Sequence, residues 1–413
     1  MNLILALDHR FLRTPDGSYW STTLYPYAFW SRYLGVFDRM SILARVHDAP
    51  TKLDSWKRVD GDQVSFVPVP AYVGPWQFVR SFPRVRRAIR RADLETSAIL
   101  LRIPGMVPSI LASCLRSDQP YGIEVVGDPY DVFSKHPGSH PLRPFFRWWF
   151  TRTLKGQCRA AACSLYLTEH ALQARYPPSE GRLSVSASES DMKDAAFVDS
   201  IRESADPTSA GTTDSTDGHG GRRFRLIFVG TLEALYKSPD VLVEAFARSV
   251  ARGLHGELVM IGDGRERPRI EQLAQRFGVR DRLNFLGQLP GGEAICRQLD
   301  ASDLFVLPSR QEGMPKAMIE AMARGLPCIG TPVGGVPELL PEVALVPRND
   351  VEALAQKILQ FARDSRLRAE MARVNLAKAR RYHESLLQPR RIPFYERLSR
   401  LTREWQNVQG IHA

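Results

Sequence analysis

The chain has 413 residues, 44% of them hydrophobic, and a formal net charge of +11. This length exceeds what one hydrophobic core supports, so we expect two domains of roughly 150 to 200 residues each. The five cysteines form no C-x-x-C pair, which disfavours a disulfide framework or a structural zinc site and favours a reducing compartment. The first apolar run is too short for a signal peptide, and no later run approaches the roughly 20 apolar residues of a membrane span. We therefore expect a cytoplasmic protein whose membrane contact is at most peripheral.

The first half of the chain alternates short apolar runs with helical patterns. Continuous apolar runs of this kind are typical of parallel strands that helices cover on both faces. The expected strands are residues 3–7, 41–46, 64–70, 98–105 and 121–128. Residues 1–202 are therefore predicted to form a Rossmann-like α/β domain.

Positive charge is concentrated in residues 80–159, which hold 14 Lys and Arg against 6 Asp and Glu, a difference of +8. Residues 82–93 place five arginines around an apolar helical stripe, and residues 140–159 interleave five aromatic side chains with arginine and lysine. Cationic helices with large aromatics suit the interface of an anionic bilayer. The same pattern arises when the aromatics are core and the cations are a solvated face, and the sequence leaves both interpretations open.

The clearest boundary is at residues 203–223, which are rich in Ser, Thr, Gly and Asp and predict a flexible linker or loop. From residue 224 to 384, short apolar strands alternate with amphipathic helices, which predicts a doubly wound α/β domain. In the tail, residues 385–413, we expect Pro389 and Pro393 to interrupt the chain before a terminal helix that crosses back to the first domain.

Residues 310–327, RQEGMPKAMIEAMARGLP, carry the most distinctive pattern. Glu312 lies on a loop after a predicted strand, at the sheet edge where open α/β sheets bind ligands. A helix follows, and its first amides offer an anion site suited to phosphate. Glu320 lies inside this helix, roughly 12 Å from Glu312 if the whole segment were helical. Two carboxylates on either side of a phosphate site can accept hydroxyl groups at both ends of a nucleotide sugar, whereas the alternative is that both are ordinary solvated acids.

Four segments together resemble the family-4 glycosyltransferases, which are retaining enzymes with the GT-B fold of two Rossmann-like domains facing a cleft. The segment EGMPKAMIEAMARGLPCIGTPVGGVPELL is similar to the E-x7-E signature region of that family. The other matching segments are FVGTLEALYKSPDVLVEAF, LVMIGDGRERPRIEQLA and NFLGQLP, in the family order and spacing. The resemblance is specific over residues 225–382 and looser before residue 200.

This resemblance implies roles for individual residues. Glu312 would contact hydroxyls of the transferred sugar, Glu320 the ribose of the nucleotide, and Lys237 the diphosphate. A cation beside a helix N-terminus can stabilise a leaving nucleoside diphosphate without a metal ion. The remaining donor-side positions implied by the family are Gly17, Gly230, Thr231, Gly313, Met314 and Pro315.

The sequence departs from the family at two places. Members usually carry an Arg soon after the glycine of the first strand in the second domain, and this chain has Thr231 there. Many members also carry a histidine in the first domain, which the corresponding strand ends lack. Candidates for the acceptor side are instead His9, Arg102, Glu124 and Asp128.

We therefore expect a metal-independent, retaining transferase that moves a hexose from a UDP- or GDP-sugar to a glycan. We expect this glycan to be lipid-linked, because the basic first domain suits an anionic membrane surface. The expected role is polysaccharide biosynthesis on the inner face of the cell membrane, with no nucleic acid partner. The main alternative is a catalytically inactive relative that binds a nucleotide sugar or a partner. A nucleic-acid binder lacks a zinc or RNP-type motif, and an NAD-dependent oxidoreductase would need a G-x-G-x-x-G that VGTLEA does not supply.

Overall fold

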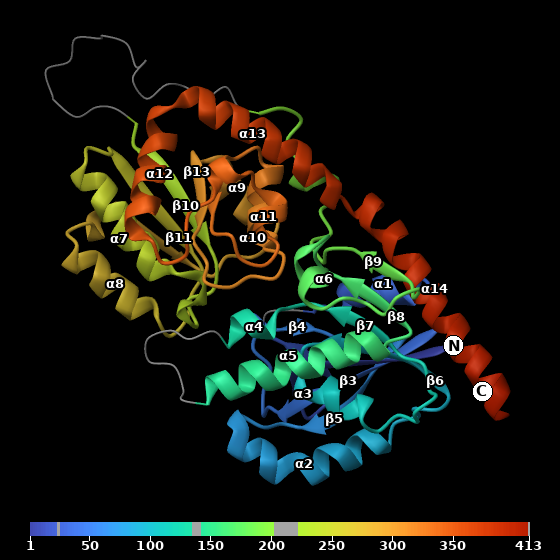
Figure 1. Ribbon diagram of the computed structural model, residues 1–413. Coiled ribbons are helices and arrows are strands. Elements are labelled where there is room, and N and C mark those ends of the chain that lie inside the picture. The colour runs from blue at the N-terminus through green and yellow to red at the C-terminus, as the bar shows by residue number, and fades with distance from the viewer. Residues whose placement is uncertain (23–24, 134–141, 202–221, 412–413) are drawn as a thin grey trace, which may run out of the picture. The chain divides into compact units, whose positions relative to one another are not determined.

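The computed structural model describes residues 1–22, 25–133, 142–201 and 222–411. These residues form two compact units. The first unit comprises residues 1–187 and 388–413, and the second comprises residues 188–387. Each unit is an α/β layer structure around a parallel sheet, as the alternation of apolar strands and amphipathic helices predicts (Figure 1).

The sheet of the first unit has seven parallel strands in the order β5-β3-β1-β6-β7-β8-β9. Two short strands, β2 and β4, add an antiparallel extension at the end of β1. The central strand β6 is buried at every position, because helices cover both of its faces. The strands are β1 (Asn2–Arg13), β2 (Tyr19–Ser21), β3 (Arg39–Asp48), β4 (Lys57–Arg58), β5 (Val64–Pro70), β6 (Ser97–Ile103), β7 (Gly122–Val125), β8 (Cys163–Tyr166) and β9 (Ser184–Ser186).

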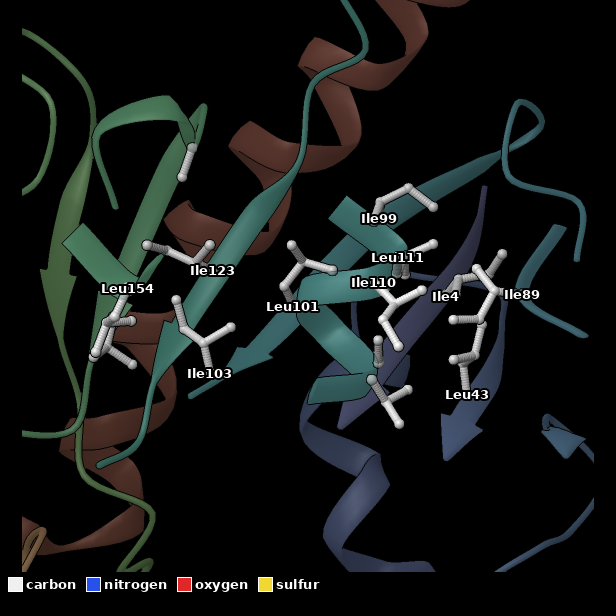
Figure 2. Close-up of a cluster of buried hydrophobic side chains, with 14 of the residues drawn as sticks. Ile4, Leu43, Ile89, Ile99, Leu101, Ile103, Ile110, Leu111, Ile123 and Leu154 are labelled. Atoms are coloured by element: carbon white, nitrogen blue, oxygen red, sulfur yellow. The ribbon is translucent and has the colours of Figure 1, made fainter. Parts of the chain in front are cut away.

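Helices α2, α3 and α5 of the first unit form a layer on one face of this sheet. Side chains of α2, α3 and α5 meet alternate residues of β1, β6 and β7 in one apolar cluster, and Figure 2 shows Ile89, Leu111 and Leu154 directed toward the strands. The helices are α1 (Ser31–Leu34), α2 (Gly74–Arg90), α3 (Met106–Ala112), α4 (Pro129–Val132), α5 (Arg143–Ala160) and α6 (Ala171–Arg175). Among the described residues, none of the helices has both the length and the hydropathy needed to cross a bilayer.

The second unit holds a five-stranded parallel sheet in the order β12-β11-β10-β13-β14. Its strands and helices follow the predicted alternation within a few residues. The strands are β10 (Phe224–Val229), β11 (Gly256–Ile261), β12 (Leu283–Gly287), β13 (Leu304–Leu307) and β14 (Cys328–Gly330). The helices are α7 (Pro239–Ala251), α8 (Arg267–Arg276), α9 (Glu293–Asp300), α10 (Lys316–Ala323), α11 (Val336–Leu339), α12 (Val351–Arg363) and α13 (Ser365–Ala379).

The chain enters the second unit earlier than the predicted boundary after residue 202. The amide of Val198 donates to the carbonyl of Ala323, and the amide of Met192 donates to the carbonyl of Tyr382. Residues 188–201 therefore belong to the second unit, although their sequence contains no strand or helix signal that would assign them. The predicted linker lies mostly outside the described residues.

The prediction of a break at Pro389 and Pro393 was wrong, because helix α14 (Glu384–Gln409) runs through both prolines. A proline inside a helix costs about 3 kcal/mol or more, since it removes a backbone hydrogen bond and crowds the preceding turn. Here Phe394 and Leu398 are fully buried and would contact a side chain added at Gly122 of β7. Burial of each such apolar side chain contributes about 1.5 to 3 kcal/mol, which offsets the proline penalty.

A buried ion pair joins this tail to the sheet of the first unit. Arg102 at the end of β6 donates to Glu124 of β7 at 2.7 Å, and both side chains are at most 4% exposed. The same carboxylate accepts the hydroxyl groups of Tyr33 and Tyr395 at 3.0 and 3.1 Å. Burial and the charge of Glu124 raise the pKa of Tyr33, so its hydroxyl stays protonated and acts as a donor. Three elements that are distant in the sequence thus depend on one carboxylate.

Replacing Glu124 by alanine is therefore expected to destabilise the first unit by about 3 to 5 kcal/mol, because Arg102 would remain buried without its partner. Tyr395→Phe is the matched control, since it removes one hydrogen bond from the same carboxylate and should cost about 1 kcal/mol. Urea unfolding measures both values. Equal losses in the two variants would show that the ion pair is not what holds this region together.

Candidate functional site

Two loops of the second unit meet at the point where the strand order of its sheet reverses. Strand β10 pairs with β11 on one side and with β13 on the other, and ligands of open α/β sheets bind beyond the carboxyl ends of the strands at such a position. The loop after β10 carries Gly230, Thr231 and Lys237, and the loop after β13 carries Glu312.

Lys237 and Glu312 form an ion pair between these loops. The Nζ atom of Lys237 lies 2.8 Å from Oε1 of Glu312, and the side chains are 15% and 8% exposed. Ser309 donates its hydroxyl to the same oxygen at 2.6 Å. None of the described residues donates a hydrogen bond to Oε2 of Glu312, so this oxygen remains able to accept one from a ligand.

The surroundings keep Lys237 charged. Burial alone lowers the pKa of this ammonium, but the charge of Glu312, the neighbouring Tyr236 and the hydrogen bond raise it, and the net shift is upward. Gly230 makes room for the lysine stem, because a Cβ atom at this position would lie 2.4 Å from Cδ of Lys237. The glycine after the first strand is thus needed for the position of the cation.

Helix α10 begins at Lys316, after an extended Pro315, so Gly313, Met314 and Pro315 form the loop that precedes the helix. No side chain caps this helix start, so its first amides are available to a ligand. Glu320 lies on the second turn of α10, 22% exposed, with Oε1 3.6 Å from Nζ of Lys316. Burial raises the pKa of Glu320, and the positive charge of Lys316 opposes the shift only in part.

The backbone around Glu312 is fixed by a third loop. Gly334 has a φ of +51°, and a Cβ atom there would lie 2.0 Å from the carbonyl oxygen of Glu312. The amide of Gly335 donates to the carbonyl of Gly313 at 2.7 Å, and the hydroxyl of Tyr382 contacts the sulfur of Met314 at 3.8 Å. These contacts place the carboxylate and the start of α10 beside each other.

Arg310 is a residue of this site that the sequence did not single out. It forms two hydrogen bonds with Asp240 at the start of α7, at 2.9 and 2.8 Å, and a third with the carbonyl of Leu235 at 2.5 Å. Its own amide donates to the carbonyl of Tyr236 at 2.7 Å. Arg310 therefore joins the loop of Glu312 to the loop of Lys237. Its sequence signal, an arginine two residues before Glu312, is too common to be recognised without the fold.

The other predicted donor-side residues have local contacts. The Thr231 hydroxyl accepts a hydrogen bond from the amide of Glu233 at 3.1 Å. This contact stabilises the loop and does not involve a ligand. Gly17 belongs to the first unit, where it has a φ of +83° and donates its amide to the carbonyl of Thr14 at 2.9 Å. The turn needs glycine because of this φ, and a role of Gly17 at a phosphate stays a prediction.

The acceptor-side candidates of the first unit do not form one cluster of free polar groups. Arg102 and Glu124 satisfy each other in the buried network described above. Asp128 caps α4 through the amide of Tyr130 and also binds Arg175 and the hydroxyl of Tyr176. Their roles toward an acceptor stay predictions.

His9 differs from these three residues because its polar contact is weak. Its Nε2 lies 3.3 Å from the Ser21 hydroxyl. Burial, followed by the charges of Arg45, Arg10 and Arg102, lowers the pKa of His9 to about 4. The imidazole is therefore neutral near pH 7, the form that can accept a proton.

The two basic helices of the first unit expose part of their aromatic side chains. On α2, Val85 and Ile89 are buried, whereas Trp76 is 82% exposed. On α5, Phe145, Trp148 and Trp149 are about half exposed. Phe150 instead stacks on Phe133 with ring centroids 5.1 Å apart. Phe150 is therefore packed against another ring, whereas the exposed aromatics leave contact with a bilayer as a prediction. Within the described residues, no three His, Cys, Asp or Glu side chains gather closely enough to hold a metal ion.

Comparison with known proteins shows what this part of the chain is similar to. Residues 223–364 match the family model described as glycosyl transferases group 1. Protein CapJ of Staphylococcus aureus is 22% identical over 413 residues, which is 100% of this chain and 99% of CapJ. N-acetyl-alpha-D-glucosaminyl L-malate synthase of Bacillus anthracis is 34% identical over 149 residues, which is 35% of this chain and 38% of that protein. Further relatives that align over part of their length include sugar transferases and a protein of Vi polysaccharide biosynthesis.

A solved structure with the same architecture is that of Alr3699/HepE from Anabaena in complex with UDP-glucose. Its TM-score is 0.63 at 16% sequence identity, and the match covers 97% of this chain and 100% of the other. The fold is therefore the predicted GT-B type, with two Rossmann-like units. The segment that carries Lys237, Glu312 and Glu320 is the part of the chain that is similar to the glycosyl transferases group 1.

Proposed function

We propose that this glycosyltransferase moves a hexose from a nucleoside diphosphate sugar to a hydroxyl group of a lipid-linked glycan in polysaccharide biosynthesis. The observation that carries the proposal is the ion pair of Lys237 and Glu312 at the start of α10, where the sheet order reverses. The complex of the Anabaena protein with UDP-glucose supports a donor of this class.

The chemistry follows from the charges at this site. As the bond between the sugar and the diphosphate breaks, negative charge grows on the leaving group, and Lys237 and the amides of α10 would stabilise it. The free oxygen of Glu312 would accept a hydroxyl of the sugar, and Glu320 would accept the ribose hydroxyls. The protein cation takes the place of a metal ion in this scheme, and the family implies transfer with retention of configuration.

The exposed face of α2 supports an acceptor held at a membrane. Trp76 and Val79 are 82% and 63% exposed, beside a series of exposed arginines and with no acidic residue on the helix. Such a face suits the interface of an anionic bilayer, where each cation adds about 1 kcal/mol of attraction. The enzyme would thus act at the inner face of the cell membrane.

Donor binding is testable by thermal unfolding with excess UDP, GDP or ADP in EDTA. A ligand at 100 times its dissociation constant adds about 2.7 kcal/mol, which raises the midpoint of a unit of this size by about 5 to 10 °C. One nucleoside diphosphate should produce this shift without metal, and Glu320→Ala should reduce it. Glu370→Ala is the matched control because Glu370 is an exposed carboxylate on α13, a helix that carries none of the predicted site residues.

Two results would contradict this scheme. A shift that requires added magnesium would exclude metal-independent binding, and no shift with any nucleotide would exclude the donor site. Release of UDP from a UDP-sugar in the presence of membrane-extracted glycan then distinguishes an enzyme from the catalytically inactive relative. The local contact of Thr231 favours the inactive relative. A protein that binds the donor and releases no UDP is that relative.

Gly230→Ala is expected to weaken nucleotide binding by about 10-fold or more, because the added methyl group displaces the lysine stem and a charge-assisted hydrogen bond contributes about 1.5 to 3 kcal/mol. Gly291→Ala is the control, since a Cβ atom there meets nothing within 4 Å. Titration calorimetry with the nucleotide identified above measures both. Unchanged affinity in Gly230→Ala would mean that Lys237 does not contact the diphosphate.

The raised pKa of Glu320 predicts a pH dependence of binding. Ribose hydroxyls bind the ionised carboxylate, so nucleotide affinity should fall as the pH falls through the pKa of Glu320, which lies above the ordinary value of about 4.3. Glu320→Gln should lose this part of the pH dependence and keep the part that comes from the phosphates. Parallel pH profiles for the two proteins would show that Glu320 does not contact the nucleotide.

A further inference from the structure

The first unit contains a hollow of about 870 Å³ between α4 and one face of α5. The α5 residues that line it recur at helical spacing, among them Arg147, Trp148, Arg152, Lys155 and Arg159, and Tyr130 of α4 closes the other side. We call this hollow the α5 groove. Helix α4 follows directly after β7, so the groove lies near the carboxyl edge of the sheet, the edge where α/β domains bind ligands.

The α5 groove is lined by four cations and by no carboxylate among the described residues. Arg152, Lys155 and Arg159 are exposed, and none of them forms an ion pair with a described acidic residue. Like charges spaced three and four residues apart destabilise a helix by a few tenths of a kcal/mol per pair. A bound anion would relieve this repulsion.

Arg147 is held at the wall of the groove by an aromatic ring. Its guanidinium carbon lies 3.3 Å from the centre of the Tyr130 ring, which holds the group over the aromatic face. Its Nε atom is buried and has no hydrogen-bond partner in the described part of the chain. The buried Nε cannot meet a ligand in the open groove, so Arg147 contributes to anion binding through the charge of its guanidinium group.

The aromatic side chains define the rest of the ligand. Trp148 lines the groove and is 57% exposed, and Phe145 and Trp149 are also exposed on the same helix. The ring centroid of Phe145 lies 6.1 Å from that of Trp148 and 6.1 Å from that of Trp149, so the three rings form a continuous apolar surface beside the cations. Free phosphate would not use this surface, whereas a phosphate ester on an apolar chain would use both parts.

We propose that the α5 groove binds the phosphate or diphosphate group of the lipid-linked acceptor, with Arg147, Arg152 and Lys155 on the phosphate and Trp148 beside the apolar chain. This inference rests on the proposed function, since it assigns the acceptor of that reaction to a place in the first unit. The groove thereby selects an amphipathic anion over a neutral glycan.

The test is calorimetric titration of the full chain with farnesyl diphosphate, in saturating UDP so that the diphosphate cannot occupy the donor site. Farnesyl diphosphate should bind at least about 10-fold more tightly than inorganic diphosphate, because the chain adds apolar contact. Arg152→Gln with Lys155→Gln should weaken it by about 30-fold, from two lost cations. The matched control is Arg366→Gln with Arg373→Gln on α13, where both side chains are exposed.

Trp148→Ala separates the two parts of the groove. This substitution should weaken the binding of farnesyl diphosphate and leave the affinity for inorganic diphosphate unchanged. Equal affinity for the two probes in the wild-type protein, or no effect of the Arg152 and Lys155 changes, would overturn the proposal. So would binding only to phosphatidylglycerol vesicles, which would make α5 a general membrane surface, or displacement of farnesyl diphosphate by a single-stranded oligonucleotide.

The outcome for the groove is independent of the outcome for the donor site. If the protein keeps its UDP-induced thermal shift but does not bind farnesyl diphosphate, the proposed function stands and the assignment of the α5 groove is wrong. If no nucleotide changes the unfolding temperature, the proposed function is wrong. The titration with farnesyl diphosphate in the absence of UDP then tests the α5 groove alone.

Discussion

The second unit is organised around one buried ion pair, that of Lys237 and Glu312. Each of the two charges costs several kcal/mol to remove from water, and a close, hydrogen-bonded contact offsets much of that cost. The pair joins the ends of β10 and β13, so the relative position of two loops depends on it. It also raises the pKa of Lys237 and so keeps this ammonium charged, which is the state that recognition of a diphosphate requires.

The supporting residues explain why the surrounding loops contain so many glycines. The lysine stem occupies the space where a side chain at position 230 would be, and the carbonyl of Glu312 occupies the space where a side chain at position 334 would be. Arg310 stabilises the loops by hydrogen bonding instead of by close packing. Its bonds to Asp240 and to two backbone carbonyls join the two loops without involving Lys237 or Glu312. The site is thus fixed by close backbone approach on one side and by a guanidinium on the other.

The sequence predicted the second sheet well because its strands are short, continuous and apolar, and because E-x7-E and its neighbours are contiguous in the chain. Contacts between distant segments were not predictable in this way. Nothing in the local sequence around Glu124 indicates Tyr33 or Tyr395 as partners, and Arg310 has no distinctive neighbours. The run of α14 through Pro389 and Pro393 shows the same limit, since local propensity opposes it and only the burial of Phe394 and Leu398 favours it.

The charge pattern of the chain separates structural cations from those available to a ligand. On the second unit, Arg248 and Arg252 share the carboxylate of Glu352, and Arg324 pairs with Asp300. Helix α5 carries five cations and no acidic residue, although an acidic residue four positions away would stabilise it at no cost in packing. Helix α2 shares this property, whereas cations of the second unit such as Arg248 of α7 are paired. The unpaired charges of α5 lie on the side that faces the groove, where neutralisation within the chain would remove the attraction for an anion.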